Sequence, residues 1–486
     1  MTVVVSAPED FTLEAFRRVA VAGEGVVIGP DAVRVMGEAR AGFERLLRAD
    51  PGGFIYGVTT RPGVEVGTAI PPEDLRDYAR RFRGVGRGFG RDCLDERVVR
   101  GIVFARLADF AGGHAKVRPE LAQRVAALLD GPLPRVPLDG QDGAGEILPL
   151  MHVMAAVDAG DLVEGEGMAL INGSPCATAL AADVTLHASN RLRLAEAIFA
   201  LSIEALGAPL DAYDEAEHTI LHHLRGHLRG AVTSGRLAHQ APVSYRILPQ
   251  VLGQAQRAVQ AVAHAATTAL GSVTENPVYL PASQGHPFGR VLSTGGFHNG
   301  AAAPAINWLT ASWADLALVA QRQVTAMHSP TSGLPHLLAP AGFIPGASGG
   351  ATNLFGWVAT GLVEEARALA APTLLPATIN DTQNDIATPT FGAYRSQHRA
   401  AECLDSVLAI LALVSSQALS VTSRHPAPPL AGLLNGIRSV FPPVQTEREG
   451  QGTQAAELAA IFSRAALTGQ SDFPSHRDQA SPQPSP

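Results

Sequence analysis

Four histidines fall within one short stretch of the chain whose spacing could support metal chemistry. They are His218, His222, His223 and His227, and they follow Asp214, Glu215 and Glu217. The first and second, like the third and fourth, are four residues apart and share a helix face, so either pair could hold zinc with a third ligand. The stretch has no HExxH motif. We therefore expect a histidine-rich surface helix, and a metal-dependent hydrolase using residues 218–227 is the least favoured hypothesis.

A glycine-rich loop holds two carboxylates that could move protons. Residues 140–152 read Gly-Gln-Asp-Gly-Ala-Gly-Glu-Ile-Leu-Pro-Leu-Met-His, with Asp142 and Glu146 on either side of Ala144. Both carboxylates are candidate acids or bases. Both are explained equally well as negative charges at the start of a helix. The residues alone leave the two interpretations open.

Long helical patterns must position these groups. Several segments run well beyond strand length and are rich in Ala, Leu, Glu, Gln and Arg, which favour helix. They are residues 192–205, 254–270, 306–328, 353–371 and 399–421. Their apolar residues surround most of the helix, as expected for helices enclosed by others. The pattern predicts an all-α fold.

The chain divides into three parts by composition. Residues 1–190 mix shorter helices with loops and form a predicted N-terminal domain that carries the loop described above. Residues 54–58 read as a short extended segment that runs into a mobile loop. Residues 191–468 form a predicted helical bundle, interrupted by long Gly- and Pro-rich loops that are usually functional. Residues 469–486 are rich in Ser, Pro and Gln and are predicted to be disordered.

Charge and composition exclude several classes of partner. The chain has 486 residues, of which 46% are hydrophobic, enough for a large core. The net charge of -8 and the single lysine, Lys116, argue against nucleic acid or an anionic membrane as a partner. The most apolar run, 403–421, includes Asp405 and Gln417, so we expect a buried helix there, not a membrane span.

Cysteine usage and the N-terminus indicate the compartment. Cys93, Cys176 and Cys403 are odd in number and widely spaced, so no disulfide framework is expected. The first twelve residues carry acidic side chains and no basic region, unlike a signal peptide. These features predict a cytoplasmic protein.

Seven motifs stand out in chain order. They are Tyr-Gly-Val-Thr-Thr-Arg-Pro-Gly at 56–63, Gly-His and Val-Arg-Pro-Glu-Leu within 113–121, the loop at 140–152, Glu-Gly-Glu-Gly-Met-Ala-Leu-Ile-Asn-Gly-Ser at 164–174, Val-Thr-Glu-Asn-Pro at 273–277, Gly-Gly-Phe-His at 295–298 and Ser-Gly-Leu-Pro at 332–335. Together they resemble the aromatic amino acid ammonia-lyase and aminomutase family, which includes histidine and phenylalanine ammonia-lyases. The resemblance implies the fold of the fumarase and aspartase superfamily, with a central bundle of long helices.

The resemblance also exposes one altered position. In that family an Ala-Ser-Gly triplet cyclises, and loss of the serine hydroxyl leaves the electrophilic methylidene-imidazolone (MIO) group. Here the triplet is Gly143-Ala144-Gly145, and alanine has no hydroxyl to lose. We therefore expect no MIO group, no other cofactor and no metal. General acid–base groups alone contribute about 10²- to 10⁴-fold, too little for useful elimination of ammonia from phenylalanine, tyrosine or histidine.

The resemblance implies roles for five further residues. Tyr56 stands where the family has the lid tyrosine that removes a proton, and Arg246 where an arginine pairs with the substrate carboxylate. Asn172 stands where an amide lies beside the electrophile and that carboxylate, Phe297 would wall the pocket, and Gln383 would hydrogen-bond near it. Simpler roles remain open: loop packing for Tyr56, an ion pair for Arg246 and a cap for Asn172.

Other positions depart from the family's pattern. Arg81 replaces a pocket histidine, Val243 a tyrosine beside the electrophile, and Asn384 an acidic residue. Arg81 also belongs to an arginine run at 80–87 that is equally compatible with a solvated surface. The three changes indicate a pocket of mixed polarity, with Arg81 as a candidate catalytic residue.

The leading hypothesis is an MIO-independent, lyase-like enzyme. It would act by acid–base chemistry, through elimination, addition, isomerisation or cyclisation, on a carboxylate-bearing small molecule derived from an amino acid. The alternative is a catalytically silent homologue that binds a ligand or serves as a scaffold. The resemblance implies a homotetramer whose active sites are shared between subunits, and the apolar helices after residue 300 agree with extensive interfaces.

Overall fold

The computed structural model describes residues 2–81, 88, 90–141, 143–158, 160–213, 219–344, 346, 350–378, 383–446 and 449–469. Nearly all of the predicted disordered tail lies outside these residues. Unit 1 contains Met1–Leu186, Ala261–Ile306 and Thr373–Arg395, and unit 2 contains His187–Gln260, Asn307–Pro372 and Ser396–Pro486. These units follow spatial proximity and not chain order, so the three-part division by residue number stays a sequence-based prediction.

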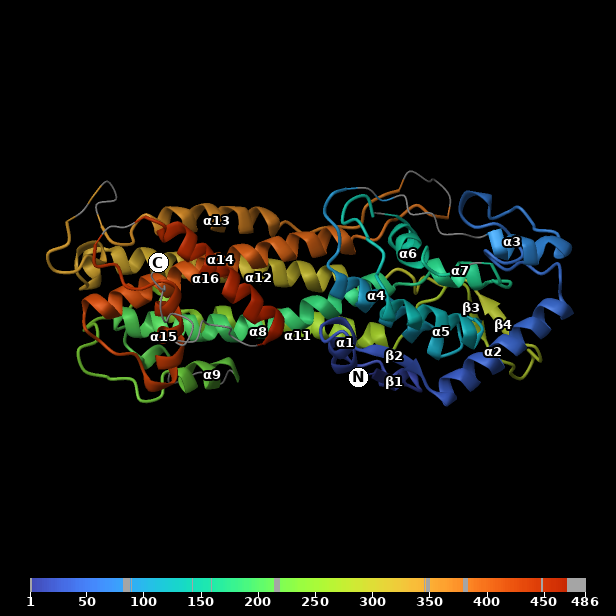
Figure 1. Ribbon diagram of the computed structural model, residues 1–486, viewed down its shortest axis with the longest axis horizontal. Helices are drawn as coiled ribbons and strands as arrows, with labels where there is room; N and C mark the ends of the chain where they lie inside the picture. The colour runs from blue at the N-terminus through green and yellow to red at the C-terminus, as the bar shows by residue number, and fades with distance from the viewer. Residues whose placement is uncertain are drawn as a thin grey trace, which may run out of the picture. The chain divides into compact units, whose positions relative to one another are not determined.

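Helices dominate the described chain (Figure 1). The shorter helices are α1 (Leu13–Ala20), α2 (Pro30–Ala49), α3 (Leu75–Arg81), α4 (Glu96–Ala111), α5 (Pro119–Ala127), α6 (Ile147–Met154), α7 (Glu166–Ile171), α9 (Thr219–His227), α10 (Val243–Arg246), α13 (Phe355–Leu369), α15 (Ala431–Val440) and α16 (Gln451–Thr468). The longest are α8 (Pro175–Leu206), α11 (Leu248–Leu270), α12 (Ala302–His328) and α14 (Thr390–Val421). The all-α fold class is confirmed.

The long helices begin earlier than the sequence pattern predicted. α8 starts at Pro175 and α14 at Thr390, where the predicted starts were residues 192 and 399. Pro175 occupies the first helical position, where its fixed φ suits the helix and its missing N–H is not needed. Most residues in the added turns of α8 are buried, so these turns lack the contrast between faces that marks an amphipathic helix.

Only short strands accompany the helices in the described residues. β1 (Thr2–Val5) pairs in parallel with β2 (Gly25–Ile28), and β3 (Val278–Leu280) pairs antiparallel with β4 (Arg290–Leu292). The predicted extended segment at 54–58 is wrong. The amides of Val58, Thr59 and Thr60 all point to the carbonyl of Ile55, so the chain turns there. Gly57 follows Tyr56 in this segment, and its φ of 66° favours such a turn.

Unit 1 is built around α4, which is buried on nearly every face. Phe16 of α1 packs edge-on against Phe104 of α4, with ring centroids 6.2 Å apart. Gly101 permits this approach, because a Cβ there would lie 2.4 Å from Phe16 Cζ. The close packing of α1 on α4 fixes the scaffold from which the loops of unit 1 extend.

Unit 2 is a helical bundle. Ala314 of α12, Ala366 of α13 and Cys403 of α14 form one buried cluster. Arg191 of α8 makes two hydrogen bonds of 2.8 and 2.9 Å to Asp405 of α14. α14 is long and apolar enough to cross a membrane by composition, but 83% of its most apolar window is buried inside the protein. That burial confirms the expected core helix at 403–421.

Candidate functional site

The altered triplet lies in unit 1, in a loop held by contacts from distant segments. The amide of Thr388 donates to the Gly143 carbonyl at 3.0 Å, and the Thr388 hydroxyl donates to the Gly145 carbonyl at 3.5 Å. Gly145 has a φ of 75°, and a Cβ on it would lie 3.0 Å from the Phe297 ring. The structure therefore brings Phe297 against the loop, and its role as a pocket wall stays a prediction. Ala144 is half-buried.

Glu146 caps a helix from inside the same loop. Its two carboxyl oxygens accept hydrogen bonds from the amides of Cys176 and Ala177, at 2.5 and 2.6 Å, in the first turn of α8. Burial raises the pKa of this carboxyl to about 8, although both amides oppose the shift. Two interpretations were left open for Glu146, an acid–base residue or a carboxylate at the start of a helix. Its contacts match the second interpretation, at the start of α8. Asp142 lies outside the described residues.

Tyr56 and Gln383 both hydrogen-bond to the backbone of Gly63, in the segment 56–63 that the family resemblance identifies as a lid. The phenolic oxygen of Tyr56 accepts a hydrogen bond from the Gly63 amide at 3.0 Å, and the Gln383 amide donates to the Gly63 carbonyl at 2.7 Å. A Cβ on Gly63 would lie 3.8 Å from Asn384 Nδ2. Because the Tyr56 oxygen acts as acceptor in this contact, its own proton stays free for another partner. The structure thus joins Tyr56, Gln383 and Asn384 in one cluster.

Asn172 sits at the end of α7, next to the lid. The side chain is 7% exposed; its oxygen accepts from the Gly173 amide at 2.8 Å, and its nitrogen contacts Met168 Sδ at 3.4 Å. Met168 also fills the space beside Gly57, where a Cβ would lie 2.2 Å from its methyl carbon. Met168 therefore connects Asn172 to the turn that carries Tyr56.

A buried charge network, which was not predicted from the sequence, contacts the backbone of Asn172. Arg106 donates to the Asn172 carbonyl at 2.5 Å and forms ion pairs with Asp109 and, at 3.0 Å, with Glu275. Burial raises the pKa of Glu275 to about 7 and lowers that of Lys116, which donates to a backbone carbonyl, to about 8. Glu275 lies in the motif at 273–277, but Arg106 and Asp109 lie in none of the seven motifs, so the network could not be recognised from them.

Arg81 ends α3 and is exposed. Its Nε donates to the carbonyl of Asp77, one turn earlier in the same helix, at 3.2 Å. Within the described residues no contact joins Arg81 to Tyr56, Asn172 or the altered loop. Its role as a catalytic residue stays a prediction, and most of the arginine run after it lies outside the described residues.

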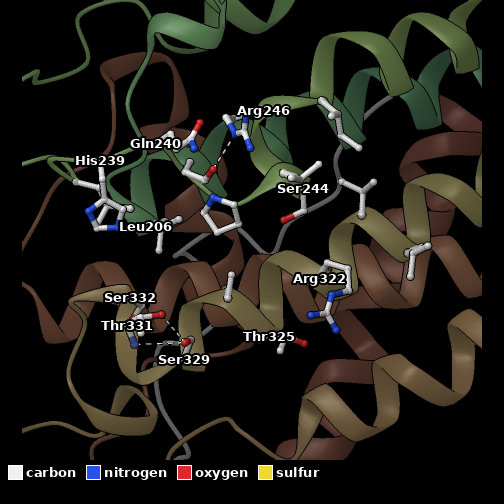
Figure 2. A pocket seen from close by; sticks show the side chains of 18 residues that line it. Leu206, His239, Gln240, Ser244, Arg246, Arg322, Thr325, Ser329, Thr331 and Ser332 are labelled. Carbon is white, nitrogen blue, oxygen red and sulfur yellow. Dashed lines mark hydrogen bonds between the residues drawn. The ribbon is translucent and has the colours of Figure 1, made fainter.

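Arg246 and Val243 belong to α10 in unit 2, at the wall of a pocket of about 840 Å³ (Figure 2). Arg246 Nε donates to the Ala241 carbonyl at 2.9 Å, which leaves both terminal guanidinium nitrogens available for a ligand. Two buried contacts fix this helix. Tyr213 donates to the Tyr245 carbonyl at 2.9 Å, and Gln323 donates to the Ser244 carbonyl at 2.8 Å. The pairing of Arg246 with substrate stays a prediction.

The histidine-rich stretch forms α9 from residue 219 onward. His223 Nδ1 lies 3.1 Å from Glu196 of α8, whose pKa burial raises to about 7. His218 and the three acidic residues before it lie outside the described residues. In the part of the chain that the structure describes, no three His, Cys, Asp or Glu side chains are grouped to hold a metal. The metal-dependent hydrolase hypothesis therefore gains no support from these residues.

The helical fold, the glycine-rich loop and the lid together define the class of protein. The chain belongs to the aromatic amino acid lyase family, which it matches over residues 11–163 and 155–439. The residues present do not fit the MIO group associated with the family, because Ala144 supplies no hydroxyl at the centre of the triplet.

Individual relatives agree with this assignment. The chain is 28% identical over 490 residues to the histidine ammonia-lyase of Geobacillus thermodenitrificans, covering 92% of this chain and 94% of the relative. Its fold is similar to tyrosine aminomutase from Streptomyces globisporus, with a TM-score of 0.81, 23% identity and coverage of 95% and 98% of the two chains. It is also similar to the ergothioneine-degrading ergothionase of Treponema denticola, with a TM-score of 0.85, 18% identity and coverage of 97% and 100%. These two structures show the shared fold.

Proposed function

We propose that the protein is a lyase-like enzyme that works without an MIO group on a carboxylate-bearing small molecule derived from an amino acid. The proposal is carried by one combination: Ala144 lacks the reactive hydroxyl, while Tyr56 is held at Gly63 and Asn172 is connected to the turn at Gly57 through Met168. The proton-transfer and binding groups are thus present without the precursor of the electrophile.

Tyr56 is the proposed acid–base residue. In an elimination, its deprotonated oxygen takes a proton from carbon, the electron pair of that C–H bond forms the new double bond, and the leaving group departs with its own bonding electrons. The Gly63 amide that donates to the phenolic oxygen stabilises negative charge there. The reverse sequence adds a nucleophile to an unsaturated acid, and the same proton transfers serve an isomerisation or a cyclisation.

The absence of the electrophile limits which leaving groups the substrate can have. Acid–base groups alone contribute about 10²- to 10⁴-fold to a rate. We therefore propose that the leaving group is better than ammonia, for example a nitrogen already fully alkylated, or that the substrate is already activated. The compounds to be assayed include histidine, tyrosine and ergothioneine, because the relatives described above are named for activity on these compounds.

We further propose a cytoplasmic homotetramer whose active sites combine residues of several subunits. Arg246 and Val243 line a pocket formed wholly by residues of unit 2, whereas Tyr56, Asn172 and the altered loop belong to unit 1. Exposed apolar side chains on α13, such as Trp357 at 79% exposure, support association. Sedimentation velocity measures the assembly directly.

Proton exchange tests the proposed chemistry. Substrate analogues incubated in deuterated water should gain deuterium at the carbon beside the leaving group with wild type, and exchange should vanish in Tyr56→Phe. Tyr279→Phe is the matched control, because its hydroxyl contacts only the Phe288 carbonyl, at 3.2 Å, among its recorded hydrogen bonds. Equal inertness of wild type and Tyr56→Phe across a broad panel of carboxylic acids would favour a silent homologue that binds a ligand.

A further inference from the structure

The pocket at Arg246 contains a second arginine that the proposed function does not use. Its lining combines the segment around α10 with one face of α12, and Figure 2 shows Arg246 on the α10 side and Arg322 on the α12 side. The α12 residues that line it recur at helical spacing; they are Leu318, Val319, Arg322, Thr325 and Ala326. The lining contains no aspartate or glutamate.

Both arginines are exposed, and neither is paired with a carboxylate within the described residues. Arg246 uses only its Nε, for a backbone carbonyl, and Arg322 makes no hydrogen bond or ion pair within the described residues. Many other arginines of the described chain are paired with a carboxylate, as Arg191 is with Asp405. Both side chains are exposed, so solvent screens their mutual repulsion, and the donors that they leave unused are what an entering anion would contact.

The two arginines also match the geometry of a particular ligand. Each guanidinium presents a planar fork that holds one carboxylate or phosphate group through two parallel hydrogen bonds. The Thr325 hydroxyl, on the same helix as Arg322, already donates to the Gln321 carbonyl at 3.1 Å, so the guanidinium groups are the main donors for such a ligand. Apolar residues such as Leu318 and Val243 provide the surface for a short carbon skeleton between the two ends.

We propose that the ligand of this pocket carries two oxyanions: the carboxylate held by Arg246 and a second acidic group held by Arg322. The inference rests on the proposed role of Arg246 and narrows the substrate class to diacids derived from amino acids. Arg322 is then the residue that selects diacids over monoacids.

Calorimetry on the full-length assembled protein tests this selectivity without turnover. The probes are succinate, glutarate and adipate, the monocarboxylates of equal chain length, and 3-phosphonopropionate. The best diacid should bind wild type about ten-fold or more tightly than its monocarboxylate. Arg322→Gln should bring that ratio close to one while it keeps the monocarboxylate affinity, and Arg246→Gln should weaken both classes. Arg257→Gln, an exposed arginine of α11 bonded only to Gln254, should behave as wild type.

Several results would overturn the inference. They are a ratio near one in wild type, a ratio that survives Arg322→Gln, or no binding of any probe. A fourth is dissociation of the oligomer by Arg322→Gln in sedimentation velocity, because Arg322 would then pair with an acidic group of another subunit. A preference for 3-phosphonopropionate supports the inference and identifies phosphate as the second group. Diacid selectivity without Tyr56-dependent deuterium exchange would refute only the proposed proton-transfer chemistry. Deuterium exchange without diacid selectivity would refute only the proposed second acidic group.

Discussion

Replacing Glu146 with glutamine should change how the stability of the protein depends on pH. The carboxyl is 2% exposed and accepts two amide hydrogen bonds at the start of α8. Burial raises its pKa from an ordinary value of 4.5 to about 8. A shift of that size corresponds to about 5 kcal/mol at most.

The direction in which stability changes with pH follows from proton binding by Glu146. The folded protein holds the Glu146 proton more firmly than the unfolded chain does. The resulting stabilisation is therefore fully present below pH 4.5 and is lost as the pH rises through about 8. Glutamine does not titrate, but its NH₂ group faces one of the two amide donors. That donor is left without an acceptor, at a cost of about 1–3 kcal/mol.

Urea unfolding of wild type and Glu146→Gln at a series of pH values measures both effects. The variant should be the less stable protein near pH 5 and the more stable one above about pH 8, because the titration outweighs the lost bond. Glu38→Gln is the control, since Glu38 is exposed and pairs only with Arg34 one turn away. Its effect should stay within about 0.5 kcal/mol throughout. A constant difference between wild type and Glu146→Gln across the range would refute the assigned pKa.

Three further changes probe the loop and the pocket. Gly145→Ala should destabilise the protein by about 1–2 kcal/mol, because alanine is strained at the positive φ of this position. The new methyl group should also press on Phe297, and a double-mutant cycle of urea unfolding with Phe297→Ala should show that this second cost is relieved. Ala144→Ser should lose two water molecules by intact mass, whereas wild type should keep the full mass of its sequence; a lighter wild type would contradict the assignment. Gln323→Leu should weaken monocarboxylate binding in calorimetry by about ten-fold, because it removes the buried hydrogen bond to Ser244 that fixes α10; unchanged affinity would argue against that support.

The sequence predicted the long helices because their composition and periodicity act over many residues. The predicted ends at 270, 328 and 421 coincide with the ends of α11, α12 and α14. The start of α8 was missed because its first turns, from Pro175, are buried on all sides and show no polar face. The paired strands were missed because each holds only three or four residues, and their pairing depends on partners elsewhere in the chain.

The candidate site was predicted only where its signal lies within a short motif. Tyr56, Asn172 and Phe297 could be located because each stands in a local pattern that resembles the family. Thr388, which holds two carbonyls of the altered loop, acts through hydrogen bonds to residues more than 200 positions away. Arg322 lies on an ordinary helical face, and only its neighbours in space show that it shares a pocket with Arg246.

Ala144 leaves the scaffold around it intact, because every contact that fixes the loop uses other atoms. Thr388 bonds the backbone of its neighbours, Phe297 packs on Gly145, and Glu146 caps α8, so the missing hydroxyl costs the fold nothing. The guanidinium of Arg322 also contributes no recorded bond to folding, and it lines the same pocket as Arg246, a pocket whose lining contains no carboxylate. Groups that folding alone does not account for are the better guide to the ligand, and they point to an acid with two charged ends.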